Sequence, residues 1–198
     1  DIRRYQFWEW TQGVGLYGVW KLYKETKDER YMNILTSYYE RQLKIGLPAK
    51  NVNTVTPLLA MSFVAEETDN GRYMEVCREW ARWIYADFPR TKEGGLQHIT
   101  SDTLNEGELW DDTLFMTVLF LANMGRILGE KKYQDEAEYQ FLLHILQTVK
   151  RASGITAGPL RKRAILLQPS GEEGTAGLQQ RFRNFWHCVP AVQVWKSF

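Results

Sequence analysis

Hydrophobic residues recur at steps of three and four along most of the chain, which is the spacing of amphipathic helices. The segment 29–45 shows the pattern clearly, with Tyr31, Leu35 and Tyr38 on one face. The same periodicity predicts six helices, over residues 5–26, 29–45, 55–67, 71–87, 111–127 and 131–150. Short links join them in pairs, so the predicted fold class is all-α. Its units are αα-hairpins, which build bundles, solenoids or α/α toroids.

Two stretches interrupt the helical pattern. Residues 88–110 carry Pro89, a Gly pair and scattered polar side chains, which predicts a long loop, and long loops in compact domains are often functional. Residues 151–198 show neither helical nor strand periodicity. We therefore divide the chain into a helical domain, 1–150, and an irregular tail, 151–198.

Three glycines, Gly13, Gly15 and Gly18, lie inside the first predicted helix. No strand precedes them, so they do not form a phosphate-binding loop. Because glycine lowers helix propensity, we expect these positions to serve another purpose. They would allow a second backbone to approach the helix closely.

Charge and composition exclude several function classes. The 25 Lys and Arg nearly cancel the 24 Asp and Glu, and a net charge of +1 gives no electrostatic basis for binding nucleic acid or a membrane surface. No apolar run is long enough to span a bilayer. The two cysteines form no disulfide framework, and no signal-peptide pattern is present. These features favour a cytoplasmic protein.

Aromatic residues are abundant, with eight Trp, ten Tyr and nine Phe. Aromatic rings pack hydrophobic cores, and their faces also stack on sugar rings. For any single ring we favour core packing.

The richest candidate chemistry flanks the start of the fifth predicted helix. His98 follows a glycine pair, and Trp110, Asp111 and Asp112 stand together at the helix start. A carboxyl group beside an indole ring can serve as a general acid. The alternative is that both Asp residues only cap the helix and complement its dipole. His and Cys residues show no metal-ligand spacing, so we predict no metal site and no cofactor.

Four runs of residues resemble glycoside hydrolase family 105, the unsaturated rhamnogalacturonyl hydrolases. They are WTQGV (10–14), NVNT (51–54), GGLQH (94–98) and LWDDTLFM (109–116), and their order and spacing also match. The last run is the most specific of the four. The resemblance covers residues 5 to about 145, roughly the first half of a family domain, and it implies a partial (α/α)₆ toroid.

The resemblance also implies a reaction. Family members remove a 4,5-unsaturated uronic acid from the non-reducing end of rhamnogalacturonan oligosaccharides, without a metal, by protonation and hydration of a vinyl ether. The Asp before Thr-Leu-Phe-Met matches Asp112, the acid/base, and His98 and Trp110 match substrate-contacting positions. Asn53 and Trp10 are expected to line the same cavity. Two alternatives stay open: an unsaturated glucuronyl hydrolase, and a non-catalytic helical scaffold.

The resemblance stops after His144, where the family continues with segments like TGLWYHGW and WGRGNSW. Neither is present, but codons read one base early can encode both, since the third base of each codon is free. Residues 153–159 can then give WYHGWT, and residues 160–177 can give FEEKGNFAAAFWGRGNSW. We interpret the tail as frameshifted, the alternative being a genuine divergent tail. A truncated toroid is expected to be weakly active or inactive, and to self-associate through exposed inner helices.

Overall fold

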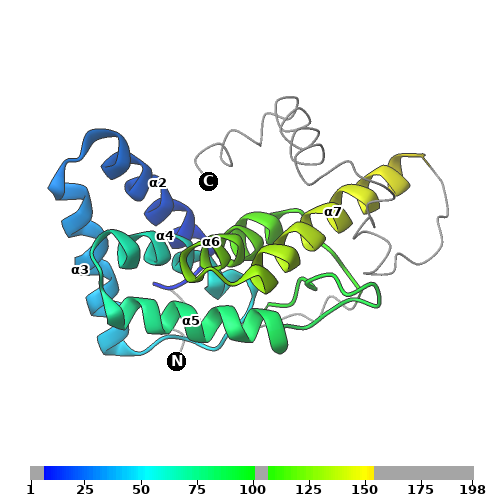
Figure 1. Ribbon diagram of the computed structural model, residues 1–198, viewed down its shortest axis with the longest axis horizontal. Helices are drawn as coiled ribbons and strands as arrows, with labels where there is room; N and C mark the ends of the chain where they lie inside the picture. The colour runs from blue at the N-terminus through cyan, green and yellow to red at the C-terminus, as the bar shows by residue number, and fades with distance from the viewer. Residues whose placement is uncertain (1–6, 101–106, 154–198) are drawn as a thin grey trace. The chain divides into compact units, whose positions relative to one another are not determined.

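The computed structural model describes residues 7–100 and 107–153 (Figure 1). Within these residues the secondary structure is helical apart from one isolated bridge between Arg90 and Leu96. The α-helices are α2 (Trp10–Thr26), α3 (Glu29–Ile45), α4 (Val52–Glu67), α5 (Gly71–Ala86), α6 (Leu119–Leu128) and α7 (Lys131–Ser153), and a π-helical turn, η1 (Leu114–Val118), precedes α6. The predicted order of three helical hairpins is confirmed.

The helices form two rows. Helix α4 packs against α2 on one side and against η1 and α6 on the other, so α2, α4 and α6 make the inner row. Helix α3 contacts α2 and α4, α5 contacts α4 and α6, and α7 contacts α5, α6 and η1. Figure 1 shows α4 between α2 and α6. Alternation of inner and outer helices along the chain is the arrangement of an α/α toroid.

Helix α4 begins at Val52, three residues before the predicted start. The Asn51 side chain accepts a hydrogen bond from the Thr54 N–H at 3.0 Å, and the Thr54 hydroxyl accepts one from the Asn51 N–H at 2.8 Å. This reciprocal capping box starts the helix early. Pro57 therefore lies inside the helix rather than in its first turn. Because proline has no N–H, the Asn53 carbonyl lacks its usual partner four residues on.

Helix α2 begins at Trp10 rather than at residue 5. Residues 7–9 form a turn, and the residues before them lie outside the described part of the chain. The turn is fixed by Trp8, which is fully buried and donates its indole N–H to the Thr54 carbonyl at 2.8 Å. The start of α2 is thus tied to the start of α4.

Aromatic rings fill the contact between the inner helices, as the sequence predicted. Trp20 stacks on Phe63 of α4 with 5.4 Å between ring centroids, and Tyr17 meets Phe115 edge to face. In the outer row the buried Tyr39 donates its hydroxyl to the Pro57 carbonyl at 2.9 Å. These contacts bury the apolar faces of neighbouring helices against each other.

Only one of the three helical glycines serves a close approach within the described residues. A Cβ atom at Gly13 would lie 2.6 Å from the Thr56 backbone carbon, whereas Gly15 and Gly18 have no atom within 4 Å of that position. Gly13 therefore brings α2 against α4. Gly15 and Gly18 lie on the exposed face of α2, so close packing at these two positions stays a prediction.

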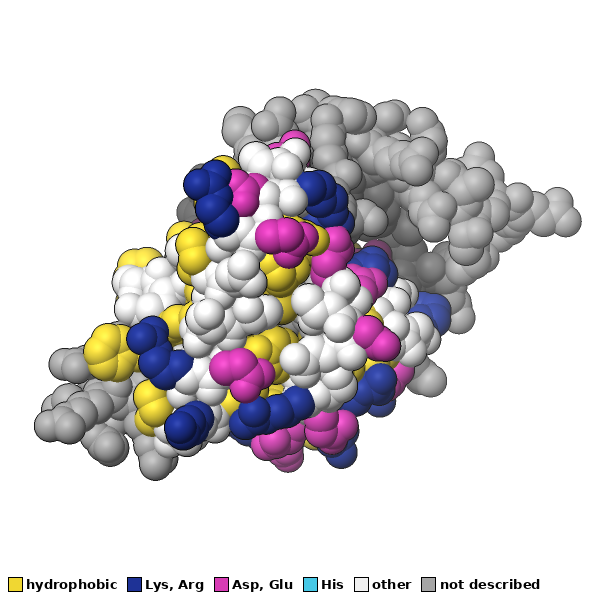
Figure 2. Space-filling model, turned by 90° about the vertical axis from the view of Figure 1, so that its left-hand side faces the viewer, with side chains coloured by type: hydrophobic (Ala, Val, Ile, Leu, Met, Phe, Trp, Pro, Cys, Tyr) yellow, Lys and Arg dark blue, Asp and Glu magenta, His cyan; other side chains and the backbone are white. Residues whose placement is uncertain are grey.

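The surface agrees with the balanced charge of the sequence. On the face shown in Figure 2, Lys and Arg side chains alternate with Asp and Glu, with hydrophobic side chains visible between them. None of the described helices is long and apolar enough to cross a membrane. The predicted tail falls on residues outside the description, except that α7 extends to Ser153.

Replacing Gly13 with Ala is expected to lower the free energy of unfolding. The added methyl group would clash with Thr56, a strain of about 1–3 kcal/mol that outweighs the better helix propensity of alanine. Gly15→Ala is the matched control and should be neutral or stabilising by up to about 1 kcal/mol. Urea unfolding followed by circular dichroism measures both. Equal effects of the two substitutions would contradict the close approach at Gly13.

Candidate active site

The loop between α5 and η1 begins as a narrow hairpin that presents His98. The Gln97 N–H donates to the Pro89 carbonyl at 2.9 Å, and the Thr91 N–H donates to the Gly95 carbonyl at 2.8 Å. Gly94 makes the turn with a φ of 85°, a conformation that favours glycine. The hairpin thus reverses the chain and leads directly into His98.

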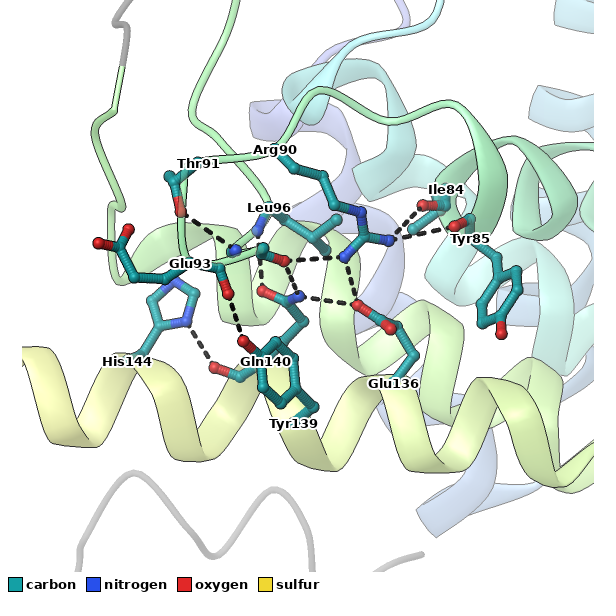
Figure 3. A network of polar contacts seen from close by, with 12 residues as sticks. Ile84, Tyr85, Arg90, Thr91, Glu93, Leu96, Glu136, Tyr139, Gln140 and His144 are labelled. Atoms are coloured by element: carbon teal, nitrogen blue, oxygen red, sulfur yellow. Dashed lines mark hydrogen bonds and ion pairs between the residues drawn. The ribbon is translucent and has the colours of Figure 1, made fainter. Parts of the chain in front are cut away.

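Helix α7 holds this hairpin through buried polar contacts (Figure 3). Arg90 forms an ion pair with Glu136, whose side chain is only 1% exposed. Tyr139 donates its hydroxyl to the Glu93 carbonyl. Burial raises the pKa of the Tyr139 phenol, and the nearby Glu136 charge raises it further, so the hydroxyl remains a donor at neutral pH. The helix and the hairpin are joined by specific bonds as well as by apolar packing.

His98 and Trp110 stack face to face at the far end of the loop. Their ring centroids are 4.1 Å apart and the ring planes differ by 12°. The backbone N–H of His98 donates to the backbone carbonyl of Glu108 at 3.1 Å. The Trp110 indole N–H donates to the Glu108 carboxylate at 2.7 Å. The imidazole is buried whereas the indole is 44% exposed. One side of the indole is thus covered by His98, and the ring remains accessible to a ligand.

Asp112 joins this pair. Its Oδ1 lies 3.4 Å from the His98 Nδ1, an ion pair when the imidazole is protonated, and its side chain is 46% exposed. Nδ1 makes no hydrogen bond to any described residue. The structure therefore brings together three of the predicted site residues, His98, Trp110 and Asp112, and leaves the carboxylate open to water.

The helix that follows Asp112 contains a feature that the sequence did not reveal. Residues Leu114–Val118 form the π-helical turn η1, in which the Leu119 N–H bonds to the Leu114 carbonyl five residues back. Such turns occur often at functional sites because the extra residue changes the direction of the side chains before it. The predicted helix over 111–127 is thus present but is divided between η1 and α6.

A cavity of about 740 Å³ opens beside the cluster. Its lining is formed by Glu93, Gly107, Glu108, Leu109, Trp110, Asp111, Asp112, His144 and Gln147. Neither Trp10 nor Asn53 belongs to this lining. Among the described lining residues four are carboxylates and none is Lys or Arg, so the described side chains that line the cavity carry a net negative charge.

His144 lies on an apolar helix, which favours a structural role. Its buried ring also lines the cavity. Its Nδ1 lies 2.7 Å from the Gln140 carbonyl. Because a carbonyl only accepts, Nδ1 carries the proton and Nε2 is the acceptor of the neutral ring. The sequence also missed Glu93, Glu108 and Gln147, since none belongs to a helix-start motif.

The described residues hold no group of three or more His, Cys, Asp or Glu side chains that could bind a metal ion. The carboxylates of the cavity are accompanied by an indole and two imidazoles. This set offers a proton donor, hydrogen-bond partners and an aromatic face, which are the groups that sugars require.

Comparison with known proteins identifies relatives. The chain is 34% identical over 143 residues to the unsaturated rhamnogalacturonyl hydrolase YesR of Bacillus subtilis (strain 168), an alignment covering 69% of this chain and 40% of the relative. A crystal structure of a possible member of the GH105 family from Klebsiella pneumoniae subsp. pneumoniae MGH 78578 matches with a TM-score of 0.69 and 43% identity, over 70% of this chain and 36% of that chain.

A second such structure, from Salmonella enterica subsp. enterica serovar Paratyphi A str. ATCC 9150, matches with the same TM-score of 0.69 and 45% identity, over 70% of this chain and 37% of that chain. The chain thus spans less than half the length of these relatives. The match confirms the predicted α/α toroid, of which the described helices form one part.

The profile of the family Glycosyl Hydrolase Family 88 matches residues 1–155. This range includes the three helical hairpins and the whole His98–Trp110–Asp112 cluster. The GH105 resemblance drawn from the four sequence runs is confirmed by the structural relatives. The chain therefore belongs to Glycosyl Hydrolase Family 88.

Proposed function

We propose that the protein derives from an enzyme that removes a 4,5-unsaturated uronic acid from the non-reducing end of rhamnogalacturonan oligosaccharides. The observation that carries this proposal is the cluster of Asp112, His98 and Trp110 at the mouth of a sugar-sized cavity. It supplies an acid, a neighbouring imidazole and an aromatic platform. We further propose that the enzyme works in the cytoplasm, without a metal or cofactor.

In the proposed reaction Asp112 protonates C4 of the vinyl ether. Water then adds at C5, its proton returns to a base, and the resulting hemiketal opens to release the shortened oligosaccharide. Asp112 suits the acid and base steps because its carboxylate is exposed to solvent and lies beside the His98 ring. Trp110 would hold the sugar ring against its exposed face.

Charge argues that the described residues form only part of the binding site. A uronate is an anion, yet the described cavity lining contributes Glu93, Glu108, Asp111 and Asp112 and no Lys or Arg. An arginine fork is the usual partner for a sugar carboxylate. Without such a cation the described lining repels the substrate. We therefore propose that the chain as printed is weakly active or inactive.

Asp112→Asn tests the acid. In a chain whose reading frame has been restored, we expect the substitution to lower kcat by about 10²- to 10⁴-fold, the usual contribution of a general acid. Loss of the ultraviolet absorbance of the unsaturated uronate measures turnover. Asp111→Asn is the matched control and should retain most of the activity, because Asp111 forms no ion pair with His98.

The printed 198-residue chain should show little turnover in the same assay. Hydrolysis of unsaturated glucuronyl substrates in place of rhamnogalacturonan fragments would assign the alternative specificity. A stable, soluble monomer that binds neither substrate would support a helical scaffold.

We also propose that the residues after about 150 are read in a shifted frame. The family profile ends at residue 155 while the chain continues to residue 198. Because the third base of each codon is free, reading one base early can give WYHGWT and then WGRGNSW, in the order and at the spacing that the family has. The second segment contains the arginine that the described lining lacks. The proposal thus accounts for both the lost periodicity and the missing cation.

Sequencing the source DNA across codons 140–198 tests this reading. We expect one missing or extra base near codon 145, and the corrected frame should encode both motifs without a stop codon. A confirmed frame as printed would make the tail a genuine divergent segment.

We propose, finally, that the chain self-associates through the exposed face of α2, the side turned away from α4. Trp10, Val14 and Leu22 follow one another at steps of four and eight residues and are 47%, 45% and 48% exposed. No charged residue occurs between Trp10 and Trp20. An inner helix with an exposed, uncharged apolar face favours association with another molecule.

Val14→Lys is expected to shift the chain toward the monomer. A lysine in the middle of the apolar face cannot be buried in a contact without losing its hydration. Ile34→Lys is the matched control, since Ile34 is 53% exposed on α3, and should leave association unchanged. Sedimentation velocity over a range of concentrations measures both. A wild-type chain that stays monomeric at all concentrations would contradict the proposal.

A further inference from the structure

One face of α7 contacts two segments of the loop between α5 and η1. The first arm is the hairpin that leads into His98, and the second arm is the segment that leads into Trp110. Glu136, Gln140, Leu143 and His144 lie on this face at helical steps of four, three and one, and all four are buried. Figure 3 shows the polar members of this set directed from α7 toward the hairpin. The contacts of the two arms differ in kind.

The first arm is held by the Gln140 amide. Its Oε1 accepts the Leu96 N–H at 2.8 Å, and its Nε2 donates to the Gly94 carbonyl at 2.9 Å and to the Glu136 carboxylate at 2.8 Å. The side chain is fully buried. These bonds fix the backbone at Leu96, two residues before His98.

Only an amide side chain meets these demands. Leu96 requires an acceptor, while the Gly94 carbonyl and the Glu136 carboxylate each require a donor, and only Asn and Gln carry an acceptor and two donors on an NH₂ group within one planar group. Arg90 donates to the same Glu136 carboxylate and to the Gly94 carbonyl. The positive charge of Arg90 offsets the buried carboxylate, so the network is satisfied on both sides.

The second arm is held by apolar contact. A Cβ atom at Gly95 would lie 2.5 Å from Leu109 Cδ2 and 2.9 Å from Leu143 Cδ2, so both leucine side chains pack against Gly95. Leu109 immediately precedes Trp110. The His98 side of the stack is therefore tied to α7 through Gln140, and the Trp110 side is tied to the hairpin through Leu109.

We propose that Gln140 is a positioning residue that sets the His98 ring on the indole of Trp110 and beside Asp112. Gln140 touches neither substrate nor reacting atoms. Its relevance to catalysis rests on the proposed function of Asp112. Loss of the amide frees the Leu96 N–H and loosens the segment that carries His98, which then keeps the backbone bonds from Gln97 to Pro89 and from His98 to Glu108. Leu109 still packs against Gly95, so the stack opens from the His98 side.

The stack gives a spectroscopic signature that needs no substrate. A proton over an indole face resonates upfield, and the chain has only three histidines, His98, His144 and His187. Single His→Gln substitutions assign the three imidazole Hε1 resonances of the 198-residue chain in a ¹H–¹³C spectrum. We expect the His98 resonance to lie upfield of the position of an unstacked ring.

Gln140→Met removes the polar amide at nearly constant size, and the His98 resonance is expected to lose its upfield shift. Glu138→Gln is the matched control, because Glu138 is exposed on the same helix, and should leave the resonance in place. If Gln140→Met does not fold, Gln140→Glu replaces it. That variant keeps the acceptor for Leu96 but loses both donated bonds, and should reduce the shift.

Circular dichroism confirms that each variant retains its helices. An unchanged His98 resonance in a folded Gln140→Met or Gln140→Glu variant would overturn the positioning role. The spectrum is recorded without ligand, so absence of hydrolase activity leaves this test intact. Conversely, a failed spectroscopic test leaves the proposed reaction at Asp112 unaffected.

Discussion

Helix α4 needs apolar neighbours on opposite sides, and this constraint organises the rest of the described structure. From Val52 to Ala65 the helix carries no charged residue, and all but two of these positions are buried. A helix that is apolar all round is stable only when other elements enclose it. Helices α2, η1 and α6 provide the enclosure within the inner row, and α3 and α5 close the outer side. The contact at Gly13 and the bond from Trp8 to Thr54 are the local means by which α2 reaches α4.

The same requirement is unmet at α2. Its buried side, with Leu16, Tyr17 and Trp20, resembles that of an inner helix, but its other side exposes Trp10 and Val14. In a closed ring each inner helix has a neighbour on both sides. The relatives are more than twice as long as the segment that matches this chain. An apolar face on α2 is what a ring segment presents where the next helix of the ring would pack.

Much of the fold could be predicted from the sequence because the spacing of hydrophobic residues indicates which side of a helix is buried. The bounds of α3 agree with the prediction, and α5 differs by one residue at its end. Periodicity could not locate the start of α4, since the capping box at Asn51 depends on side-chain bonds rather than on apolar spacing. Nor could it detect η1, because a single extra residue in a helical turn leaves the apolar spacing nearly unchanged.

The candidate site divides in the same way. His98, Trp110 and Asp112 were found because they lie in short runs with a distinctive order, and the structure brings them together. The prediction that Asn53 and Trp10 line the same cavity stays a prediction, since neither lines the described cavity. Glu136 and Gln140 were not found. They are 46 and 44 residues from Arg90 and Leu96, the hairpin residues they bond, and on the helix they resemble ordinary polar positions. Such a role becomes visible only when the tertiary contacts are known.

Helix α7 positions the site residues, whereas the charge that attracts the substrate has to come from elsewhere. Its buried face completes the hydrogen bonds of the Gly94–Gly95 hairpin, so the acid, the imidazole and the indole are positioned by residues within the described chain. What the described lining lacks is positive charge for an anionic sugar, and charge can be supplied by a segment that is not needed to hold the loop. Positioning and substrate attraction are thus carried by different parts of the sequence. A shift of reading frame near codon 145, beyond Glu136 and Gln140 in α7, would preserve the geometry of the acid while removing the attraction that brings the substrate to it.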